Sequence, residues 1–166
     1  YALISLFDGT ATALAAVQGE LGYSPTAILL AEIEENVRPF SADLLDISPT
    51  PTLWKHSNMT TPDGDPVPVR YLKNVWEALE NHAAPIRQML SILRHAVIGD
   101  HPIKVVIVAG SPCQDLTTYG GSRGALGFTG QRSRHFHVIY YILHVLVSLI
   151  GKDNVYFVVE NAGSML

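Results

Sequence analysis

One thiol and one carboxyl group stand at the ends of two apolar runs, in positions that would suit covalent chemistry on a bound ligand. Cys113, the only cysteine of the chain, lies in the stretch SPCQDL directly after the apolar run 103–110. Glu160 ends a second apolar run in NVYFVVEN. Backbone N–H groups and cations can hold a thiol in such a loop as a reactive thiolate, and an inert small loop residue is the alternative interpretation. If both runs are parallel strands, the two groups project from the same rim of one sheet.

Two further predicted strand ends carry residues that would suit a nucleoside. The run 1–7 leads into DGTAT, where Gly9 permits a tight turn and a close approach of the backbone to a ligand. The run 27–31 leads into Glu32, where a Rossmann-type sheet places an acid for ribose hydroxyls. The spacing matches neither GxGxxG nor GxxxxGK[ST], so it indicates neither a pyrophosphate nor a triphosphate. A cofactor with one ribose and no phosphate fits better, and an ordinary glycine turn is the alternative.

The elements that must position these residues alternate along the chain between strand-like and helix-like patterns. The predicted strands are 1–7, 27–31, 69–72, 103–110 and the NVYFVVEN run. The predicted helices are 13–22, a segment from near Glu34, 74–97 with Pro85 as a break or first residue, and 134–150. This order predicts the α/β class, with a doubly wound, mostly parallel sheet and helices on both faces.

Two segments of this pattern carry more detailed expectations. The stretch 48–68 is rich in proline and threonine and has no period, so we expect an excursion on the surface. The run 103–110 does not alternate apolar with polar residues, so we expect it to be buried on both faces of the sheet.

Composition predicts one globular domain over residues 1–166 and excludes several classes. Hydrophobic residues make up 48% and charged residues 16%, which favours a packed core over disorder. A single cysteine cannot form an internal disulfide and no leader is recognisable, so we expect an intracellular protein. The longest apolar run, 138–150, is too short to cross a membrane, so no membrane partner is expected. The net charge of -4 means that any binding of nucleic acid must be local.

The motifs FDGTAT, AE, GSPCQDL and ENAG, in that order and each at a predicted strand end, resemble those of the DNA (cytosine-5) methyltransferase family. The likeness is greatest to the catalytic domain of the de novo mammalian type. It implies a Rossmann-like class I core that transfers a methyl group from S-adenosyl-methionine to carbon 5 of a cytosine flipped out of double-stranded DNA. Cys113 would add to carbon 6, Glu160 would share a proton with ring nitrogen 3, Asn161 would fix the loop, and Pro112 would stiffen the approach to the thiol.

The resemblance also assigns residues to the cofactor and to the nucleic acid. The expected cofactor residues are Phe7, Asp8, Gly9, Thr10 and Thr12 beside the methionine part, Glu32 at the ribose, Ile33 and Asn74 at the adenine, and Ser111. In the family an aspartate is usual where Asn74 stands, and leucine is more frequent where His135 stands, so only a backbone contact is expected of His135.

Residues 116–152 contain no aspartate or glutamate, so arginines beside the cysteine loop form a local positive surface for phosphates. The residues expected at nucleic acid are Gln114, Ser122, Arg123, Arg132 and Arg134. A solvated basic loop is the alternative. No metal site is predicted, because no thiolate or carboxylate joins the histidines, and we interpret His137 and His144, with Tyr141, as a stripe of the core.

The sequence departs from the family at its C-terminal end, where a target recognition domain and further motifs are absent. We therefore expect the N-terminal catalytic half only, with a sheet incomplete at the C-terminus, to be completed by a missing C-terminal segment or a partner subunit. The alternatives are a non-catalytic cofactor- or partner-binding relative and a tRNA cytosine-5 methyltransferase. The compartment would be the cytoplasm for a bacterial or phage protein and the nucleus for a eukaryotic one.

Overall fold

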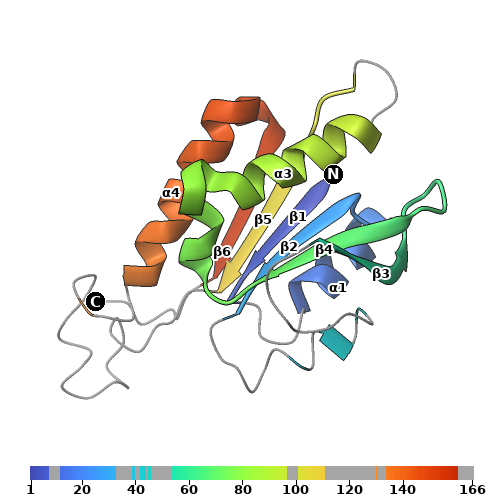
Figure 1. The fold of residues 1–166 in the computed structure, drawn as a ribbon, viewed down its shortest axis with the longest axis horizontal. Coiled ribbons are helices and arrows are strands. Elements are labelled where there is room, and N and C mark those ends of the chain that lie inside the picture. The colour runs from blue at the N-terminus through green and yellow to red at the C-terminus, as the bar shows by residue number, and fades with distance from the viewer. Residues whose placement is uncertain are drawn as a thin grey trace.

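A single twisted sheet with strand order β3-β4-β2-β1-β5-β6 forms the centre of the molecule (Figure 1). The computed structural model describes residues 1–7, 12–32, 39, 42–43, 45, 54–96, 101–110, 130 and 134–160. The strands are β1 (Ala2–Leu6), β2 (Ala27–Ala31), β3 (Lys55–Thr60), β4 (Pro66–Leu72), β5 (Val105–Gly110) and β6 (Val155–Glu160). The helices are α1 (Thr12–Leu21), α3 (Glu80–Ala96), α4 (Arg134–Ile150) and the short 3-10 helices η1 (Val75–Leu79) and η3 (Lys152–Asn154).

Five of these strands run parallel, with β1 in the middle. Leu6, the last residue of β1, pairs with Ala31 of β2 on one side and with Ala109 of β5 on the other. At the far edge Gly110 of β5 pairs with Glu160 of β6. Without β3, the strand order is β4-β2-β1-β5-β6. The strands β2 and β4 lie on one side of β1, and β5 and β6 lie on the other, as in a doubly wound sheet. The α/β class and the mostly parallel sheet are confirmed, and the arrangement is compatible with a Rossmann-like fold.

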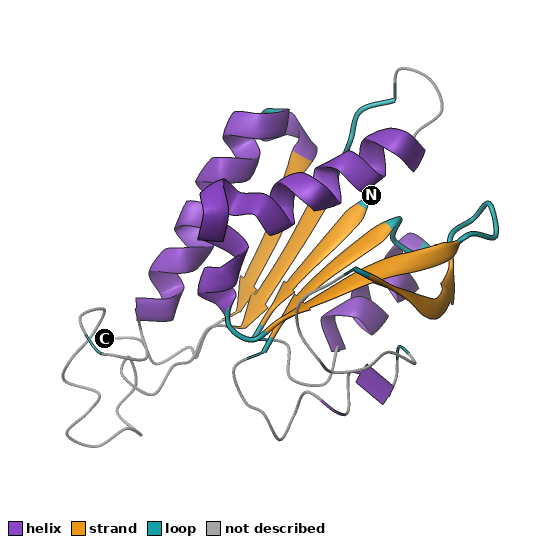
Figure 2. Cartoon of the chain, in the orientation of Figure 1, coloured by secondary structure: helices purple, strands orange, loops and turns teal. Residues whose placement is uncertain are grey.

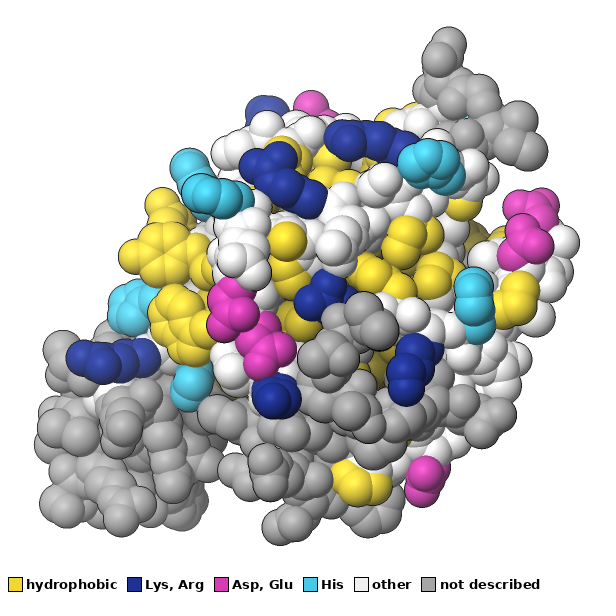
Figure 3. All heavy atoms as spheres, in the orientation of Figure 1, with side chains coloured by type: hydrophobic (Ala, Val, Ile, Leu, Met, Phe, Trp, Pro, Cys, Tyr) yellow, Lys and Arg dark blue, Asp and Glu magenta, His cyan; other side chains and the backbone are white. Residues whose placement is uncertain are grey.

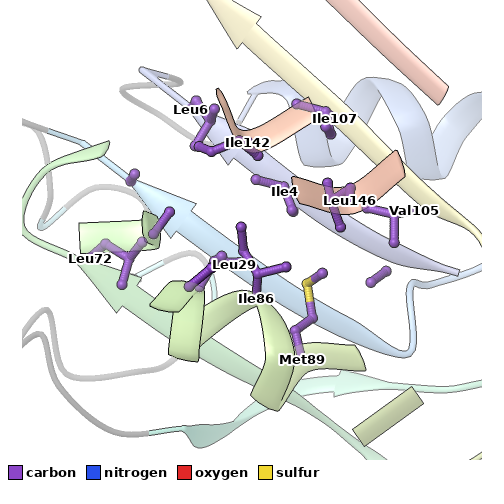
Figure 4. Packing of buried hydrophobic residues seen from close by; sticks show 14 of the residues in the cluster. Ile4, Leu6, Leu29, Leu72, Ile86, Met89, Val105, Ile107, Ile142 and Leu146 are labelled. Atoms are coloured by element: carbon purple, nitrogen blue, oxygen red, sulfur yellow. The ribbon is translucent and has the colours of Figure 1, made fainter. Parts of the chain in front are cut away.

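Helices cover both faces of the sheet because successive side chains of a strand point in opposite directions. Ile4 and Leu6 of β1 belong to a buried cluster formed with α3 and α4 (Figure 4). Leu3 belongs instead to a second cluster that includes Leu14 of α1. Gly22, with a φ of 76°, follows α1 as the C-terminal glycine that the sequence indicated. The expected helices on both faces are therefore present.

Coverage of the two faces is unequal at β5, and the neighbouring strand β6 is exposed on both faces, with Phe157 exposed on the side of α3 and α4. Along β5 buried and half-buried residues alternate, and Tyr156 and Val158 of β6 are exposed. The expectation that the run 103–110 is buried on both faces is therefore wrong. The physical reason is that α3 and α4 lie over one face, whereas the described part of the α1 face has no helix over these two strands (Figure 1).

The proline-rich stretch 48–68 contains a strand that the sequence analysis did not predict. β3 pairs antiparallel with β4, and only Ser57 of β3 is buried, where its hydroxyl donates to the Val67 carbonyl oxygen at 3.0 Å. β4 begins at Pro66, three residues before the expected start of this strand. Proline has no N–H to donate, and the pairing is irregular between His56 and Thr60. Because β3 is an exposed and mostly polar edge strand, its sequence shows little of the alternation between apolar and polar residues by which a strand is predicted.

The segment after β4 forms two helical elements, where the sequence left one or two open. The 3-10 helix η1 leads into α3, and near the start of α3 a kink at Asn81 to Ala83 has positive φ values of 49° to 59°. Pro85 follows this turn, where its fixed φ suits the first turn of a regular helix.

The last helix, α4, matches the expected range 134–150 but buries a narrower face than expected. Its buried residues are Val138, Ile139, Ile142 and Leu146. His137, Tyr141 and His144 are exposed, so their interpretation as a core stripe is wrong. The helical period of the apolar residues is present as predicted, but these three positions lie on the side of the helix opposite to its buried residues. None of the described helices combines the length and the apolar content that crossing a membrane requires.

The same substitution in two neighbouring parallel strands should test the unequal coverage. Val105 is fully buried, so Val105→Ala should lower the free energy of unfolding by about 2–3 kcal/mol through lost burial and a residual cavity. Val158 is 60% exposed, so Val158→Ala should change it by less than about 0.5 kcal/mol. Urea unfolding of both variants measures the difference, and equal losses would contradict the description of the two faces.

Candidate functional site

The carboxyl ends of β1, β5 and β6 lie along one edge of the sheet (Figure 2). Residues at these ends line a hollow of about 320 Å³. Phe7, Gly110 and Glu160 line it from the three strands. A Cβ placed on Gly110 would lie 3.5 Å from Oε2 of Glu160 and 3.8 Å from the carbonyl oxygen of Phe7. The Glu160 carboxyl group therefore stands directly beside the end of β5, within reach of a ligand held at this edge.

The start of helix α1 forms another wall of the hollow. Thr12, the first residue of α1, lines it together with Ala13 of the same turn and Ala16 of the next. The first turn of a helix carries partial positive charge on its N–H groups, which favours anionic or carbonyl oxygen atoms of a ligand. The hollow thus has a carboxylate on its strand side and a helix N-terminus on its helix side.

Phe7 holds a strained backbone conformation at the edge of this hollow. Its φ is 60°, in the left-handed region that residues other than glycine rarely adopt. Its N–H donates to the Ala31 carbonyl oxygen at 2.8 Å and so extends the β1–β2 ladder by one step. Such a conformation costs on the order of 1–3 kcal/mol and is concentrated at functional sites.

Glu32 lies next to this strained residue at the end of β2. It is only 7% exposed, which is unusual for a carboxylate. Because the Phe7 N–H binds Ala31, the end of β2 is held against the end of β1. Glu32 therefore occupies the position, one strand away from the hollow, that the sequence analysis predicted for a ribose-binding acid.

Asn74 has a structural contact that the sequence analysis did not anticipate. Its Oδ1 accepts from the backbone N–H groups of Trp76 at 2.9 Å and Glu77 at 3.3 Å, and so caps η1. Its Nδ2 donates to Oε1 of Glu77 at 3.4 Å. Asparagine is among the residues that most favour such caps. The assignment of Asn74 to the adenine amine stays a prediction.

His135 contributes a side chain that sequence reasoning left without a role. Its ring meets the ring of Phe7 edge to face, with centroids 5.7 Å apart and an interplanar angle of 63°. Its Nδ1 is buried and has no hydrogen-bond partner within the described part of the chain. Burial lowers the pKa of His135 from its usual value of 6.5. No sequence signal would have revealed this contact, because it joins residues from opposite ends of the chain.

The predicted site residues divide into those that the structure describes and those that it does not. Phe7, Thr12 and Glu160 come together at the hollow, Glu32 is adjacent, and Arg134 is exposed at the start of α4. The predicted residues outside the described part of the chain are Asp8, Gly9, Thr10, Ile33, Ser111, Pro112, Cys113, Gln114, Ser122, Arg123, Arg132 and Asn161. The expected approach of Cys113 to Glu160 is therefore still a prediction.

A second and larger hollow on the same side of the sheet is mostly apolar. This groove of about 570 Å³ shares Ala13, Ala16 and Val108 with the first and runs toward Tyr1 and Lys104 at the amino ends of the strands. Its lining suits apolar contact. The described residues contain no cluster of three or more potential metal ligands.

The opposite face, which carries α3 and α4, is mixed in character. Figure 3 shows basic, acidic, histidine and hydrophobic side chains interspersed over the part of this face that the structure describes. This pattern gives no extended field of one sign there.

No family model matches the chain, and a search of curated proteins found no match.

The half-buried imidazole of His135 should make stability depend on pH. Because the pKa of His135 is lower in the folded chain than its usual value of 6.5, the unfolded chain binds the proton more readily. The contribution of neutral His135 to stability is therefore complete above about pH 6.5 and falls as the pH drops through that value. Between about pH 7.5 and about pH 5, the wild type should lose more stability than His135→Phe. Urea unfolding at both pH values measures this difference.

A control for this experiment is His144→Phe, which removes an exposed histidine from the same helix. It should keep the pH dependence of the wild type. An identical decline in His135→Phe and wild type would contradict the burial of the neutral ring.

Proposed function

We propose that this chain is the catalytic core of a cytosine-5 methyltransferase that uses S-adenosyl-methionine and acts on DNA. The observation that carries the proposal is the meeting of Phe7, Gly110 and Glu160 at one edge of the sheet, with buried Glu32 beside them. The sequence resemblance supports it, because the family's motifs fall at these same strand ends. In open parallel sheets this edge is where ligands bind.

The described residues fit a cofactor with one ribose and an amino acid part. Glu32 offers a buried carboxylate for two ribose hydroxyls, which is the usual role of an acid after the second strand. Thr12 and the first turn of α1 offer N–H groups for a carboxylate. Phe7 supplies an apolar ring and a fixed carbonyl oxygen at the same place. The cofactor, when bound, supplies an electrophilic methyl group.

The chemistry on the cytosine would be divided between Cys113 and Glu160. Carbon 5 is a weak nucleophile, so the Cys113 thiolate first adds to carbon 6, and the electron pair of the 5,6 double bond is displaced toward ring nitrogen 3. Glu160, protonated or sharing a proton with the base, supplies a proton at nitrogen 3. Carbon 5 of the resulting enamine then takes the methyl group. S-adenosyl-homocysteine is the leaving group of this transfer. Loss of the proton from carbon 5 to water re-forms the 5,6 double bond and expels the thiolate, and nitrogen 3 returns its proton to Glu160, which restores the ring.

The position of Glu160 supports its part in this reaction. Glu160 is exposed at the end of an edge strand, so a base approaching the rim can contact it without entering the core. Gly110 opposite it has no side chain to block that approach. We place the phosphate backbone beside Arg134, which is exposed at the start of α4, and beside the predicted contacts Arg123 and Arg132.

Replacement of the thiol should abolish methyl transfer. Cys113→Ser keeps a similar shape but is a far weaker nucleophile at carbon 6, so transfer should fall by at least about a hundredfold. The full-length protein is incubated with DNA and with S-adenosyl-methionine labelled in its methyl group, and label at carbon 5 of cytosine is counted. Binding of the cofactor, measured by calorimetry, should stay unchanged in this variant.

Other results of that experiment would overturn the assignment. Transfer that persists in Cys113→Ser would exclude the thiol as nucleophile. Cofactor binding without transfer to DNA in the wild type would favour a non-catalytic relative. Transfer to tRNA alone would favour the tRNA enzyme.

Replacement of Glu32, the buried acid, should specifically weaken binding of the cofactor. Glu32→Gln keeps the size of the side chain but loses the charge that strengthens hydrogen bonds from ribose hydroxyls, so the Kd should rise about tenfold to a hundredfold. Glu20→Gln, on the exposed side of α1, is the matched control and should leave the Kd unchanged. Calorimetric titration measures both, and an unchanged Kd in Glu32→Gln would remove Glu32 from the site.

A further inference from the structure

We propose that the side chain of His135 is a positioning residue that holds Phe7, and with it the strained end of β1, in the shape that the ligand hollow requires. This inference rests on the proposed function in one respect, because the ligand that reports on the hollow is the methyl donor or its product. The contact itself depends on no ligand. Neither the sequence motifs nor the family resemblance gives the His135 side chain a role.

Phe7 needs support from outside its own strand. Its N–H is tied to Ala31 at 2.8 Å, and its carbonyl oxygen faces the position of Gly110 at the mouth of the hollow. Between these two fixed groups, φ is 60°, so the backbone of Phe7 would relax toward a more common conformation if the side chain were free. The ring of Phe7 packs at the edge of the main hydrophobic cluster, and this packing opposes the relaxation.

His135 provides that packing from a different element. It is the second residue of α4, and its ring meets the Phe7 ring in the edge-to-face arrangement that aromatic pairs prefer. The α4 helix is itself fixed to the sheet through Val138, Ile139, Ile142 and Leu146. The contact therefore connects a rigidly packed helix to the one strained residue at the hollow among the described parts of the chain.

The hydrogen bonding of His135 supports this role over an anchoring role for α4. Its Nδ1 is buried and has no hydrogen-bond partner among the residues that the structure describes, so none of these residues holds the ring in place through that atom. An unpaired buried nitrogen is unfavourable, and a residue chosen for stability alone would be apolar. At this position the imidazole contributes a flat ring that packs against the ring of Phe7.

Three variants at position 135 and one in the partner ring test the proposal. His135→Ala removes the ring and should raise the Kd for S-adenosyl-homocysteine, the demethylated product, about fivefold to tenfold. His135→Phe keeps a ring and should restore the wild-type Kd within about twofold. The Kd of His135→Leu should lie between those of the alanine and phenylalanine variants. In the Phe7→Leu background, His135→Ala should raise the Kd little further, because the contact between the two rings is already lost. His144→Ala, on the exposed side of α4, is the control and should leave the Kd unchanged.

A spectroscopic measurement separates this inference from the proposed function. The carbon-bound ring protons of His135 lie within the ring current of Phe7, so their NMR shifts should change in ligand-free Phe7→Leu while those of His144 do not. A wild-type chain that shows this change but binds no S-adenosyl-homocysteine would refute the proposed function and leave the contact established. Binding by His135→Ala as tight as that of the wild type, or unchanged shifts in Phe7→Leu, would overturn the role of His135.

Discussion

The parallel register around β1 is the constraint on which the rest of the structure depends. Because Leu6 pairs with Ala31 and Ala109, and Gly110 pairs with Glu160, the four strands β2, β1, β5 and β6 end together at one edge. Parallel strands also require helical crossovers, which place α1 on one face and α3 and α4 on the other. A shift of one residue in any of these pairings would turn buried side chains toward solvent and separate the groups at the hollow.

The strained end of β1 shows how this register serves a site. Phe7 continues the hydrogen bonding to β2 but then turns through a left-handed conformation, which brings its carbonyl oxygen toward the end of β5. The conformation persists because its N–H is bound and its ring is packed against His135 and the main cluster. The described contacts thus hold the rim in a fixed shape through a well-packed core, which is a general requirement for binding a ligand without reorganisation.

The two faces of the sheet differ in how well they are covered: the face under α3 and α4 is more extensively packed than the face that carries α1. Under α3 and α4 the side chains of β1, β2 and β5 form one continuous cluster. On the α1 face Tyr156 and Val158 of β6 are exposed beside an apolar groove. Strands with few buried contacts open more readily than central ones, so β6, which carries Glu160, is expected to have lower local stability than β1. The acid at the rim therefore stands on the least protected parallel strand that the structure describes.

The sequence by itself determined the α/β class, the alternation of strands and helices, the range 27–31 of β2 and the range 134–150 of α4, because long apolar periods and a terminal glycine are local signals. It also placed Glu32 and Glu160 at strand ends, where parallel sheets bind ligands, and the resemblance assigned Phe7 and Thr12 to the same edge. Only the tertiary structure decided that β3 joins the sheet, that β5 has one half-covered face, that His137 and His144 lie in solvent, and that His135 touches Phe7. These outcomes depend on which distant surfaces meet, and a periodic pattern records that a face is apolar but not what covers it.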